Sequence, residues 1–304
     1  MTALMPYTTD IQDSALLERC PALAQITAVI VTFNSAHCVA DLAQQLRGWP
    51  HVVIVDNGSA DDTLTQARQH LPQAQVIALS ENMGFGTANN RGFQTAQTPY
   101  CLMINPDCAL QPEHAQALWE TAQQWPEAAI VVPQLTGSDG KAQINYGWIR
   151  TWWAAKGPGA QAVTCVGNAC GAAMLLNMSN APHHGWFDER FFLYYEDEDM
   201  CLRLLQERKP VVVQPAVLVP HSNRGSVRGP RPIKVEYGRG YHHARSKVLF
   251  TAKHAGAATA AKHRRTALAG AIALLALRVF APSPKHVSRL WGRICGLWDA
   301  PTQY

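Results

Sequence analysis

Short apolar runs rich in β-branched residues alternate with helix-compatible segments through the first half of this 304-residue chain. The runs recur roughly every 20 to 30 residues, a spacing typical of strands joined by helices. Strands connected in this way lie mainly parallel in one sheet, so the sequence predicts an α/β fold. We expect strands at 26–33, 51–55, 75–79 and 100–104, separated by helices at 39–47, 61–70 and 87–97.

The second half of the chain is less regular. The aromatic segment 185–195 is predicted to be a loop that leads into an amphipathic helix at 196–206, and residues 136–165, rich in Gly and Trp, are predicted to be irregular. Helical periodicity returns at residue 235 and continues toward the C-terminus. The remaining expected elements are a helix at 113–125 and strands at 129–132, 171–176 and 211–219.

The composition is that of a folded protein, with 47% hydrophobic and 16% charged residues, and excludes a disordered chain. The first residues lack the basic and apolar stretches of a secretory signal, and the eight cysteines form no CxxC pair. We therefore expect free thiols in a reducing cytosol. The apolar stretch at 266–280 is shorter than the roughly 20 residues of a membrane span. It is predicted to be a peripheral amphipathic helix, with an ordinary packed helix as the alternative.

Charge is distributed unevenly along the chain. Residues 220–304 carry 15 Lys and Arg but 2 Asp and Glu, whereas the residues before them carry 11 basic and 20 acidic side chains. The net charges of the two parts are therefore near +13 and −9. A tail this basic favours an anionic partner, such as a phospholipid surface, a pyrophosphate or a nucleic acid, over the alternative of a solvated helical face.

Polar residues follow several of the predicted strands, namely Asn34, Asp56, Asn82 and Asp107. In a parallel sheet the ligand binds beyond the carboxyl ends of the strands. Asp56 can accept hydrogen bonds from a base or a ribose, although Asp-Asn-Gly is also an ordinary turn sequence. The loop at 82–86 can bring backbone N–H groups near phosphates. The loop lacks the Lys-Ser/Thr of a P-loop. It also lacks GxGxxG, and this absence argues against a dehydrogenase.

Asn105-Pro106-Asp107 ends the apolar run at 100–104 and is the candidate metal site. A divalent cation neutralises the charge that develops on a departing diphosphate, and Mg²⁺ or Mn²⁺ prefers a hard oxygen ligand such as that of Asp107. His221 follows the predicted strand at 211–219 and can supply a second ligand. The alternatives are a strand-to-helix turn capped by Asp107 and a histidine that is only hydrogen-bonded.

Four consecutive acidic residues, Glu196-Asp197-Glu198-Asp199, follow the aromatic loop. Acids in the first turn of a helix stabilise it by about 0.3–1 kcal/mol each and need no catalytic role. Mutual repulsion and the aromatic neighbours also raise the pKa of at least one of them. A raised pKa suits a general base that acts on a sugar hydroxyl. Two acids that face solvent and one that faces a cleft would satisfy both interpretations.

In their order along the chain, these motifs resemble family 2 glycosyltransferases of the GT-A fold, specifically the rhamnosyltransferase-like branch that builds bacterial polysaccharides. The resemblance covers about residues 26–250. The matching sequences are Ile30-Val31-Thr32-Phe33-Asn34, Val55-Asp56-Asn57-Gly58-Ser59, Asn82-Met83-Gly84-Phe85-Gly86, Asn89-Asn90-Arg91-Gly92, Ile104-Asn105-Pro106-Asp107, Gly171-Ala172-Ala173-Met174-Leu175, Gly185-Trp186-Phe187-Asp188-Glu189-Arg190-Phe191-Phe192 and Tyr195-Glu196-Asp197-Glu198-Asp199.

The resemblance implies a role for each matched residue. Asp197 corresponds to the general base, and Asp107 to the main metal ligand of an Asp-x-Asp motif whose first position is Asn105 here. His221 corresponds to a position that can join the metal site. The donor is expected to contact Thr32, Asn34, Asp56, Asn82, Asn89 and Asn105, and the acceptor to contact Glu196, Trp186, Tyr241 and Arg245.

The activity implied by the resemblance is that of an inverting, metal-dependent hexosyltransferase. Asp197 would deprotonate an acceptor hydroxyl, which attacks the anomeric carbon opposite the nucleotide, while Mg²⁺ or Mn²⁺ stabilises the departing diphosphate. The leading donor is dTDP-L-rhamnose, and the expected acceptor is a glycan or a lipid-pyrophosphate-linked glycan. The alternatives are transfer of another hexose from a UDP-sugar and a non-catalytic module that binds a membrane or a nucleic acid.

The same resemblance divides the chain into four regions and predicts a Rossmann-like, mostly parallel sheet flanked by helices. The basic C-terminal region is expected to contact an anionic membrane surface rather than nucleic acid. The protein would then be cytoplasmic and peripheral on the inner membrane. The regions are an N-terminal extension (1–24), a nucleotide-sugar-binding half (25–110), an acceptor-binding and catalytic half (111–235) and a basic helical region (236–304).

Overall fold

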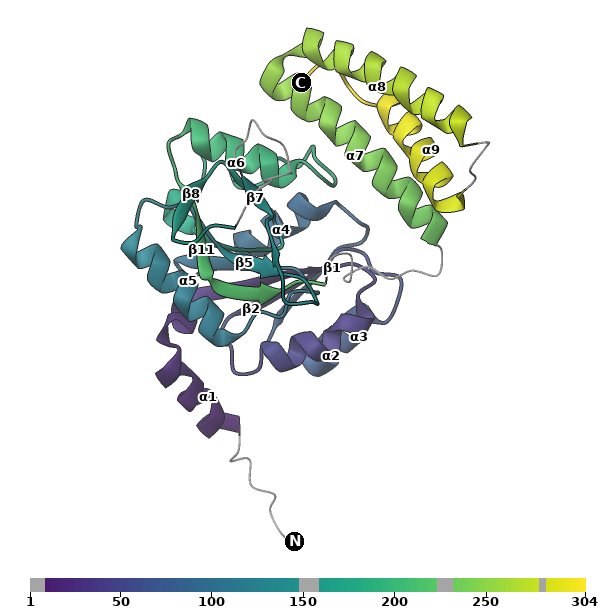
Figure 1. The fold of residues 1–304 in the computed structure, drawn as a ribbon. Helices are drawn as coiled ribbons and strands as arrows, with labels where there is room; N and C mark the ends of the chain where they lie inside the picture. The colour runs from purple at the N-terminus through teal and green to yellow at the C-terminus, as the bar shows by residue number, and fades with distance from the viewer. Residues whose placement is uncertain (1–8, 148–158, 223–231, 279–282) are drawn as a thin grey trace. The chain divides into compact units, whose positions relative to one another are not determined.

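The computed structural model describes residues 9–147, 159–222, 232–278 and 283–304 (Figure 1). The chain forms two compact units that are interleaved in sequence. The sheet unit comprises Met1–Met83, Ala88–Trp186 and Met200–Val227. The helical unit comprises Gly84–Thr87, Phe187–Asp199 and Arg228–Tyr304.

The first four strands of the sheet unit lie side by side in the order β3-β2-β1-β4, and each neighbouring pair is parallel. This arrangement confirms the predicted alternation of strands and helices, with small shifts at the ends of elements. The strands are β1 (Ile26–Thr32), β2 (Val52–Asp56), β3 (Gln75–Ala78) and β4 (Tyr100–Ile104), and the helices between them are α2 (Ala36–Gln45), α3 (Thr63–His70) and α4 (Phe85–Thr95).

The other strands make the sheet mixed. β10 (Ala173–Asn177) runs antiparallel between β4 and β5 (Ile130–Thr136), and β11 (Val211–Pro220) runs parallel to β5. The remaining elements include α5 (Pro112–Gln124), α6 (Glu196–Gln206) and the short strands β6 (Ala142–Gln143), β7 (Tyr146–Gly147), β8 (Thr164–Val166) and β9 (Asn168–Ala169). β6 pairs with β5 and β8 with β11, whereas β7 and β9 form a separate two-stranded sheet.

The prediction that residues 136–165 are wholly irregular is therefore wrong where the structure describes them, because β6, β7 and the start of β8 lie there. Strands of two or three residues are too short to show a period-2 pattern in sequence. Residues 148–158 of this segment lie outside the described residues.

Continuous burial explains why the central strands were predictable from sequence. All five residues of β2 and of β4 are buried, as expected for strands of a parallel sheet that is covered on both faces. Helix α1 (Thr9–Arg19) and the 3₁₀ turn η1 (Pro21–Gln25) precede β1. Leu16, Cys20 and Leu23 of this lead-in belong to the same hydrophobic core. Part of the predicted extension thus contributes apolar surface to the sheet unit.

Three long helices form most of the helical unit: α7 (Pro232–Ala255), α8 (Ala257–Leu277) and α9 (Pro284–Trp298). The apolar stretch predicted at 266–280 is helical as far as Leu277, and residues 279–280 lie outside the described part. Within the described residues, no helix is both long and apolar enough to cross a membrane. All eight cysteines are free thiols, as predicted.

Glycines allow α7 and α9 to approach very closely. A Cβ atom added to Gly292 would overlap the backbone carbonyl of Tyr237, and one added to Gly296 would overlap that of Tyr241. On the opposite helix, Gly240 meets the backbone of Arg289 in the same way. Small residues spaced four apart permit this backbone-to-backbone packing. The close approach gives the two helices many dispersion contacts.

We predict that Gly292→Ala destabilises the helical unit by about 1–3 kcal/mol, because the added methyl group forces the two helix backbones apart. Gly270→Ala is the matched control, since a Cβ at this exposed position of α8 meets nothing within 4 Å. That substitution is expected to leave stability unchanged or to raise it by up to about 1 kcal/mol. Urea unfolding of the two variants measures the difference, and equal stabilities would contradict the packing described here.

Candidate functional site

Asp56 ends β2 at the carboxyl edge of the sheet, where its buried carboxylate is held by neighbouring donors. Its Oδ1 accepts hydrogen bonds from Thr32 Oγ1 at 3.2 Å and from Ser59 Oγ at 2.6 Å. Its Oδ2 accepts one from the Ser59 backbone N–H at 3.1 Å. The predicted donor residues Thr32 and Asp56, from the ends of adjacent strands, are thus in direct contact. Ser59 completes the group.

Asn34 connects the loop after β1 to the loop after β2 through two hydrogen bonds. Its backbone N–H donates to Ser59 Oγ at 2.9 Å, and its side-chain Oδ1 accepts from the Ala60 N–H at 2.9 Å. The φ angle of Asn34 is 51°, a left-handed conformation that asparagine adopts more readily than most residues. Asn34, which is predicted to bind the donor, therefore also forms the turn after β1, and asparagine suits the left-handed backbone of that turn.

Asn57 was not assigned a role from the sequence, yet it connects two of the predicted loops. Its Nδ2 donates to Asn82 Oδ1 at 3.0 Å, and its Oδ1 accepts from the Met83 backbone N–H at 2.8 Å. The next residue, Gly58, has a φ of +73°, and a Cβ there would overlap the backbone of Glu81. The position of Asn57 directly after Asp56 was the only local indication of this role.

Asp107 and His221 meet at the carboxyl ends of β4 and β11, although they are far apart in sequence. The Ala109 N–H donates to the Pro220 carbonyl at 2.8 Å, and the Ser222 N–H donates to the Asp107 carbonyl at 3.1 Å. Between these contacts, Cys108 and His221 form an isolated antiparallel bridge. Residue Asn105 donates its N–H to the Ala172 carbonyl at 2.8 Å and so anchors the start of the turn.

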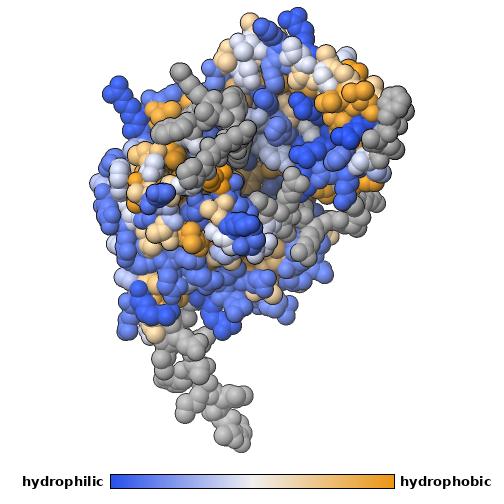
Figure 2. All heavy atoms as spheres, viewed as in Figure 1, coloured by the Kyte–Doolittle hydropathy of each residue, from blue (hydrophilic) through white to orange (hydrophobic). Residues whose placement is uncertain are grey.

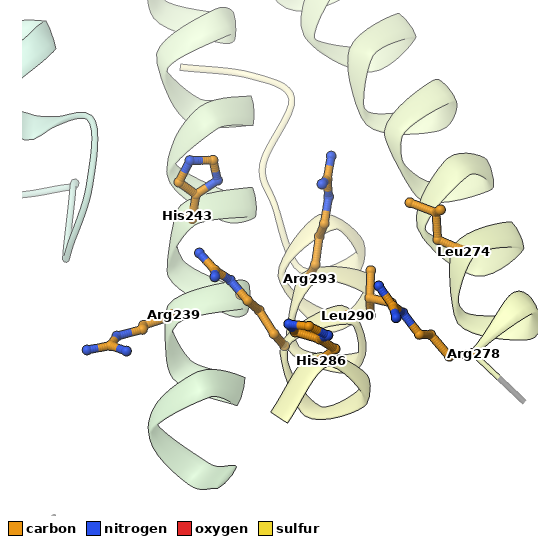
Figure 3. A pocket seen from close by; sticks show the side chains of 9 residues that line it. Arg239, His243, Leu274, Arg278, His286, Leu290 and Arg293 are labelled. Atoms are coloured by element: carbon orange, nitrogen blue, oxygen red, sulfur yellow. The ribbon is translucent and has the colours of Figure 1, made fainter. Parts of the chain in front are cut away.

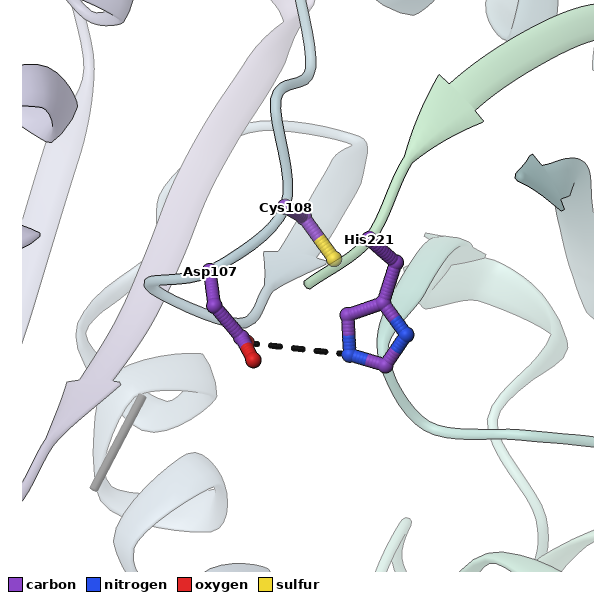
Figure 4. Close-up of side chains that lie close together, drawn as sticks. All are labelled: Asp107, Cys108 and His221. Atoms are coloured by element: carbon purple, nitrogen blue, oxygen red, sulfur yellow. Dashed lines mark ion pairs between the residues drawn. The ribbon is translucent and has the colours of Figure 1, made fainter. Parts of the chain in front are cut away.

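The side chains of Asp107 and His221 are 4% and 8% exposed, and their Oδ1 and Nε2 atoms lie 3.7 Å apart (Figure 4). This distance exceeds that of a hydrogen bond. It is short enough for one cation to contact both atoms, because each ligand bond would be about 2.1 Å long. Burial lowers the pKa of His221, against the opposing effect of Asp107, and so keeps its ring neutral. A neutral imidazole can bind a metal.

The buried Nδ1 of His221 makes no hydrogen bond to any part of the chain that the structure describes. Cys108 lies close to the same two side chains, but its thiol donates to the Ala172 carbonyl at 3.3 Å. Burial, with a smaller contribution from Asp107, raises the pKa of Cys108 well above its ordinary value, so the thiol stays protonated. The residues present therefore fit a cation held by Asp107 and His221, with Cys108 as a neighbour and not a ligand.

The acidic run lies in the helical unit, at the start of α6. Glu196, Asp197, Glu198 and Asp199 are all buried, so the arrangement that would satisfy both interpretations, with two acids facing solvent, is not the one observed. Burial and the charge of Asp197 raise the pKa of Glu196 well above its ordinary value. The same two causes, together with Glu196, raise the pKa of Glu198 to about 9. The predicted upward shift of at least one carboxyl is confirmed, and burial is its largest cause.

Asp199 is paired with Lys253 and contacts His254, and the sequence gave no reason to expect either contact. Its Oδ1 lies 2.7 Å from Lys253 Nζ and 2.7 Å from His254 Nε2. Lys253 also contacts Asp188 Oδ2 at 2.7 Å and so links the aromatic loop to α7. Ser246 supports the same connection by donating its hydroxyl to the Leu193 carbonyl at 2.9 Å. These contacts hold the last of the four acids in place.

The other predicted site residues occupy varied environments, and their roles stay predictions. Asn89 and Trp186 are both buried in the sheet unit, where the Trp186 ring meets Phe93 edge to face at 6.4 Å. In the helical unit, the Tyr241 hydroxyl donates to Asp299 Oδ2 at 3.0 Å. Arg245 lies one turn further along α7 and is half-buried.

A family model described as "Glycosyl transferase family 2" matches residues 27–178. The match extends from β1 through β10 and so includes the Asp56 cluster and Asp107. The chain belongs to glycosyltransferase family 2. This finding confirms the family resemblance drawn from the motifs.

Among known glycosyltransferases, the chain is 27% identical over 240 residues to N-acetylglucosaminyl-diphospho-decaprenol L-rhamnosyltransferase of Mycobacterium tuberculosis, covering 67% of this chain and 76% of that protein. A solved mannosyltransferase from Pyrobaculum calidifontis, in complex with GDP-Man and Mn²⁺, superimposes with a TM-score of 0.56 at 15% identity and covers 96% of both chains. GalNAc-T7 with UDP, GalNAc and Mn²⁺ gives 0.52 at 15% identity, over 69% of this chain and 46% of that one. The fold of this glycosyltransferase is thus the GT-A fold, as expected.

We predict that Glu198→Gln stabilises this glycosyltransferase more strongly as the pH rises. Between about pH 4.5 and 9 the folded chain retains a proton on Glu198 that the unfolded chain has released, so ionisation of the unfolded chain works against folding. The glutamine variant has no proton to lose. Its melting temperature should exceed that of the wild type by more at about pH 8 than at about pH 5.

The control for this comparison is Glu127→Gln, which changes an exposed glutamate of the sheet unit. Its melting temperature should follow that of the wild type across the same pH range. A Glu198→Gln difference that stays constant with pH would show that the carboxyl is ionised in the folded chain.

Proposed function

We propose that this glycosyltransferase is an inverting enzyme that moves a sugar, with L-rhamnose as the leading candidate, from a nucleotide-diphosphate sugar to a glycan or lipid-linked glycan. The observation that carries the proposal is the buried Asp107–His221 pair at the carboxyl ends of β4 and β11. A carboxylate and a neutral imidazole are suited to hold the divalent cation of a nucleotide diphosphate.

The donor nucleoside is assigned to the loops after β1 and β2. Thr32, Asn34 and Asp56 form one hydrogen-bonded group there, and Asn57 ties this group to Asn82. The side chains of this group are held in place before any ligand binds, because they hydrogen-bond to one another and to the backbone of the two loops. Preorganisation of this kind reduces the entropy lost on binding. Asn89 and Asn105 are proposed to lie near the ribose and phosphates.

Asp107 and His221 would hold Mg²⁺ or Mn²⁺ against the donor diphosphate. When bound, such a cation stabilises the negative charge on the departing nucleotide. Asp107 supplies the negative charge that attracts the cation, and His221 stays neutral because burial lowers its pKa. Cys108 remains protonated beside them and keeps its hydrogen bond to Ala172, so the ligand set has one carboxylate and one imidazole.

Asp197 is proposed to receive the proton of the acceptor hydroxyl, whose oxygen attacks the anomeric carbon from the face opposite the nucleotide. Its neighbours Glu196 and Glu198 have raised pKa values, so their protonated forms leave the run with less negative charge than its sequence suggests. Asp199 is held by Lys253 and His254. Asp197 is therefore the member of the run assigned to the proton transfer.

The rhamnosyl donor is supported by the mycobacterial relative, which is an N-acetylglucosaminyl-diphospho-decaprenol L-rhamnosyltransferase. A lipid-linked acceptor also fits the basic C-terminal region, since Lys and Arg near an anionic leaflet contribute about 1 kcal/mol each. We accordingly propose that the enzyme works at the cytoplasmic face of a membrane. A UDP-linked hexose is the alternative donor.

Asp197→Asn should lower turnover by about 10²–10⁴-fold and leave donor affinity unchanged, because an amide cannot accept the hydroxyl proton. Transfer from dTDP-L-rhamnose is measured with a radiolabelled donor, and donor affinity by calorimetry. The control is Glu127→Gln, which changes an exposed acid outside the proposed sites. Near-normal turnover of Asp197→Asn would remove this residue as the base.

Asp107→Asn and His221→Ala should each abolish the extra thermal stabilisation that Mn²⁺ adds to bound dTDP, because each removes one of the proposed ligands. Cys108→Ala should retain it, since the thiol is protonated and engaged with Ala172. Thermal shifts are recorded with dTDP and with UDP, each with and without Mn²⁺. A full Mn²⁺ effect in His221→Ala would contradict the proposed ligand set.

A further inference from the structure

A cavity of about 310 Å³ lies among the three long helices of the helical unit. Four arginines line it, from three different helices: Arg239 on α7, Arg278 at the end of α8, and Arg289 and Arg293 on α9 (Figure 3). Two histidines, His243 and His286, complete its polar wall. Four of the nine residues that line the cavity are thus arginines, whose guanidinium groups are always charged.

One carboxylate, that of Glu236, forms ion pairs with two of the four arginines. Glu236 Oε1 lies 2.6 Å from Arg239 Nη1, and its Oε2 lies 3.8 Å from Arg289 Nη1. Within the described residues, no carboxylate forms an ion pair with Arg278 or Arg293. Four guanidinium groups and one carboxylate therefore leave three positive charges unbalanced. A dianionic diphosphate diester would neutralise most of this charge, and arginine forks bind phosphate oxygens in pairs.

Nearby positive side chains add to the effect of burial on His243 in the wall of the cavity. Burial, followed by the charges of Lys247, Arg293 and Arg289, lowers the pKa of His243 to about 4. A histidine that is neutral for this reason adds no charge but can still donate one hydrogen bond to an anion. The positive charge of the cavity arises from side chains that the fold brings together, because the arginines are distributed over three helices.

Apolar side chains border the same cavity. Leu274 and Leu290 line it directly, and Leu274 is 51% exposed. Leu277 lies one helical turn beyond Leu274, and Trp291 and Trp298 are exposed on α9. Figure 2 shows hydrophobic side chains gathered on the face of the helical unit beside hydrophilic ones. Exposed Leu and Trp next to Arg are typical of a surface that contacts a lipid interface.

His243 links the wall of the cavity to the aromatic residues before α6 inside the helical unit. The ring of His243 packs edge to face on Tyr194 and Tyr195, with centroids 5.5 and 5.4 Å away. Tyr195 directly precedes Glu196-Asp197 in the chain. One wall residue of the cavity, His243, thus contacts the aromatic residues that lead into the acidic run.

We infer that this cavity binds the diphosphate of a lipid-linked acceptor, with Arg278 and Arg293 as the main contacts and the lipid chain lying along Leu274 and Leu290. This inference rests on the proposed function for the identity of the acceptor, and it adds the place where the acceptor's anionic group is held. A phospholipid headgroup offers a single phosphate and is expected to bind more weakly. A glycan without the lipid diphosphate has no group that fits the arginines.

The test uses the full chain and phosphatidylcholine vesicles that contain a long-chain polyprenyl diphosphate. Vesicles with phosphatidylglycerol at matched charge form the second arm, and inorganic pyrophosphate is added as a competitor in the third. The test variant is Arg278→Gln combined with Arg293→Gln. Arg265→Gln is the control, because this exposed arginine lies about 20 Å along α8 from Arg278 at the helical rise of about 1.5 Å per residue.

The expected result is preferential binding to diphosphate vesicles, reduced about tenfold for each arginine removed and unchanged in Arg265→Gln. Equal binding to phosphatidylglycerol vesicles would replace the inference with a non-specific membrane contact. Equal affinity for free pyrophosphate would remove the role of the lipid chain. Unchanged binding of the double variant would exclude the cavity altogether.

Transfer to a water-soluble acceptor separates this inference from the proposed function. If the double variant still transfers sugar to that acceptor but loses the diphosphate vesicles, both stand. If the wild type transfers sugar but does not distinguish diphosphate vesicles, the cavity assignment fails and the transferase stands. Melting temperature and the nucleotide thermal shift of each variant verify that it is folded.

Discussion

The candidate donor site depends on one backbone contact, the pairing of residues 107–109 with residues 220–222. Two strand ends meet there, and the Cys108–His221 bridge holds the side chains of Asp107 and His221 3.7 Å apart. Neither residue alone is unusual, since strand ends commonly carry Asp or His. The pairing makes them one buried site beside the loops of β1 and β2, and it supplies the single physical reason to expect a cation at this edge of the sheet.

Burial of charge recurs in the helical unit, where it has a different consequence. Four consecutive acids begin α6, and their surroundings differ. Asp199 is paired with Lys253, whereas burial raises the pKa of Glu196 and of Glu198. The arginine-lined cavity shows the opposite sign of charge, and within the described part of the chain Glu236 is the one carboxylate that pairs with its arginines. The acidic and the basic side chains of this unit thus gather at different places, and a count of acidic and basic residues does not reveal this separation.

Local sequence patterns predicted the strands β1, β2 and β4, because a fully buried parallel strand is a continuous apolar run. Contacts between distant segments were not predictable in this way. The Lys253–Asp199 pair and the burial of Leu16 depend on tertiary packing and leave no periodic trace in sequence. From the sequence, the arginines that line the cavity were recognisable only as part of a basic tail. Their approach to one another requires the close packing of α7 and α9 that Gly240, Gly292 and Gly296 permit.

The central claim is that Asp107 and His221 together hold a divalent cation on the donor diphosphate. Phosphorus-31 relaxation of bound dTDP in the presence of Mn²⁺ tests it most directly, because the paramagnetic effect falls off steeply with the distance between the ion and the phosphorus atoms. The account predicts strong relaxation of both phosphorus signals in the wild-type protein and its loss in His221→Ala. Equal relaxation in the two proteins would place the cation elsewhere and contradict the assignment.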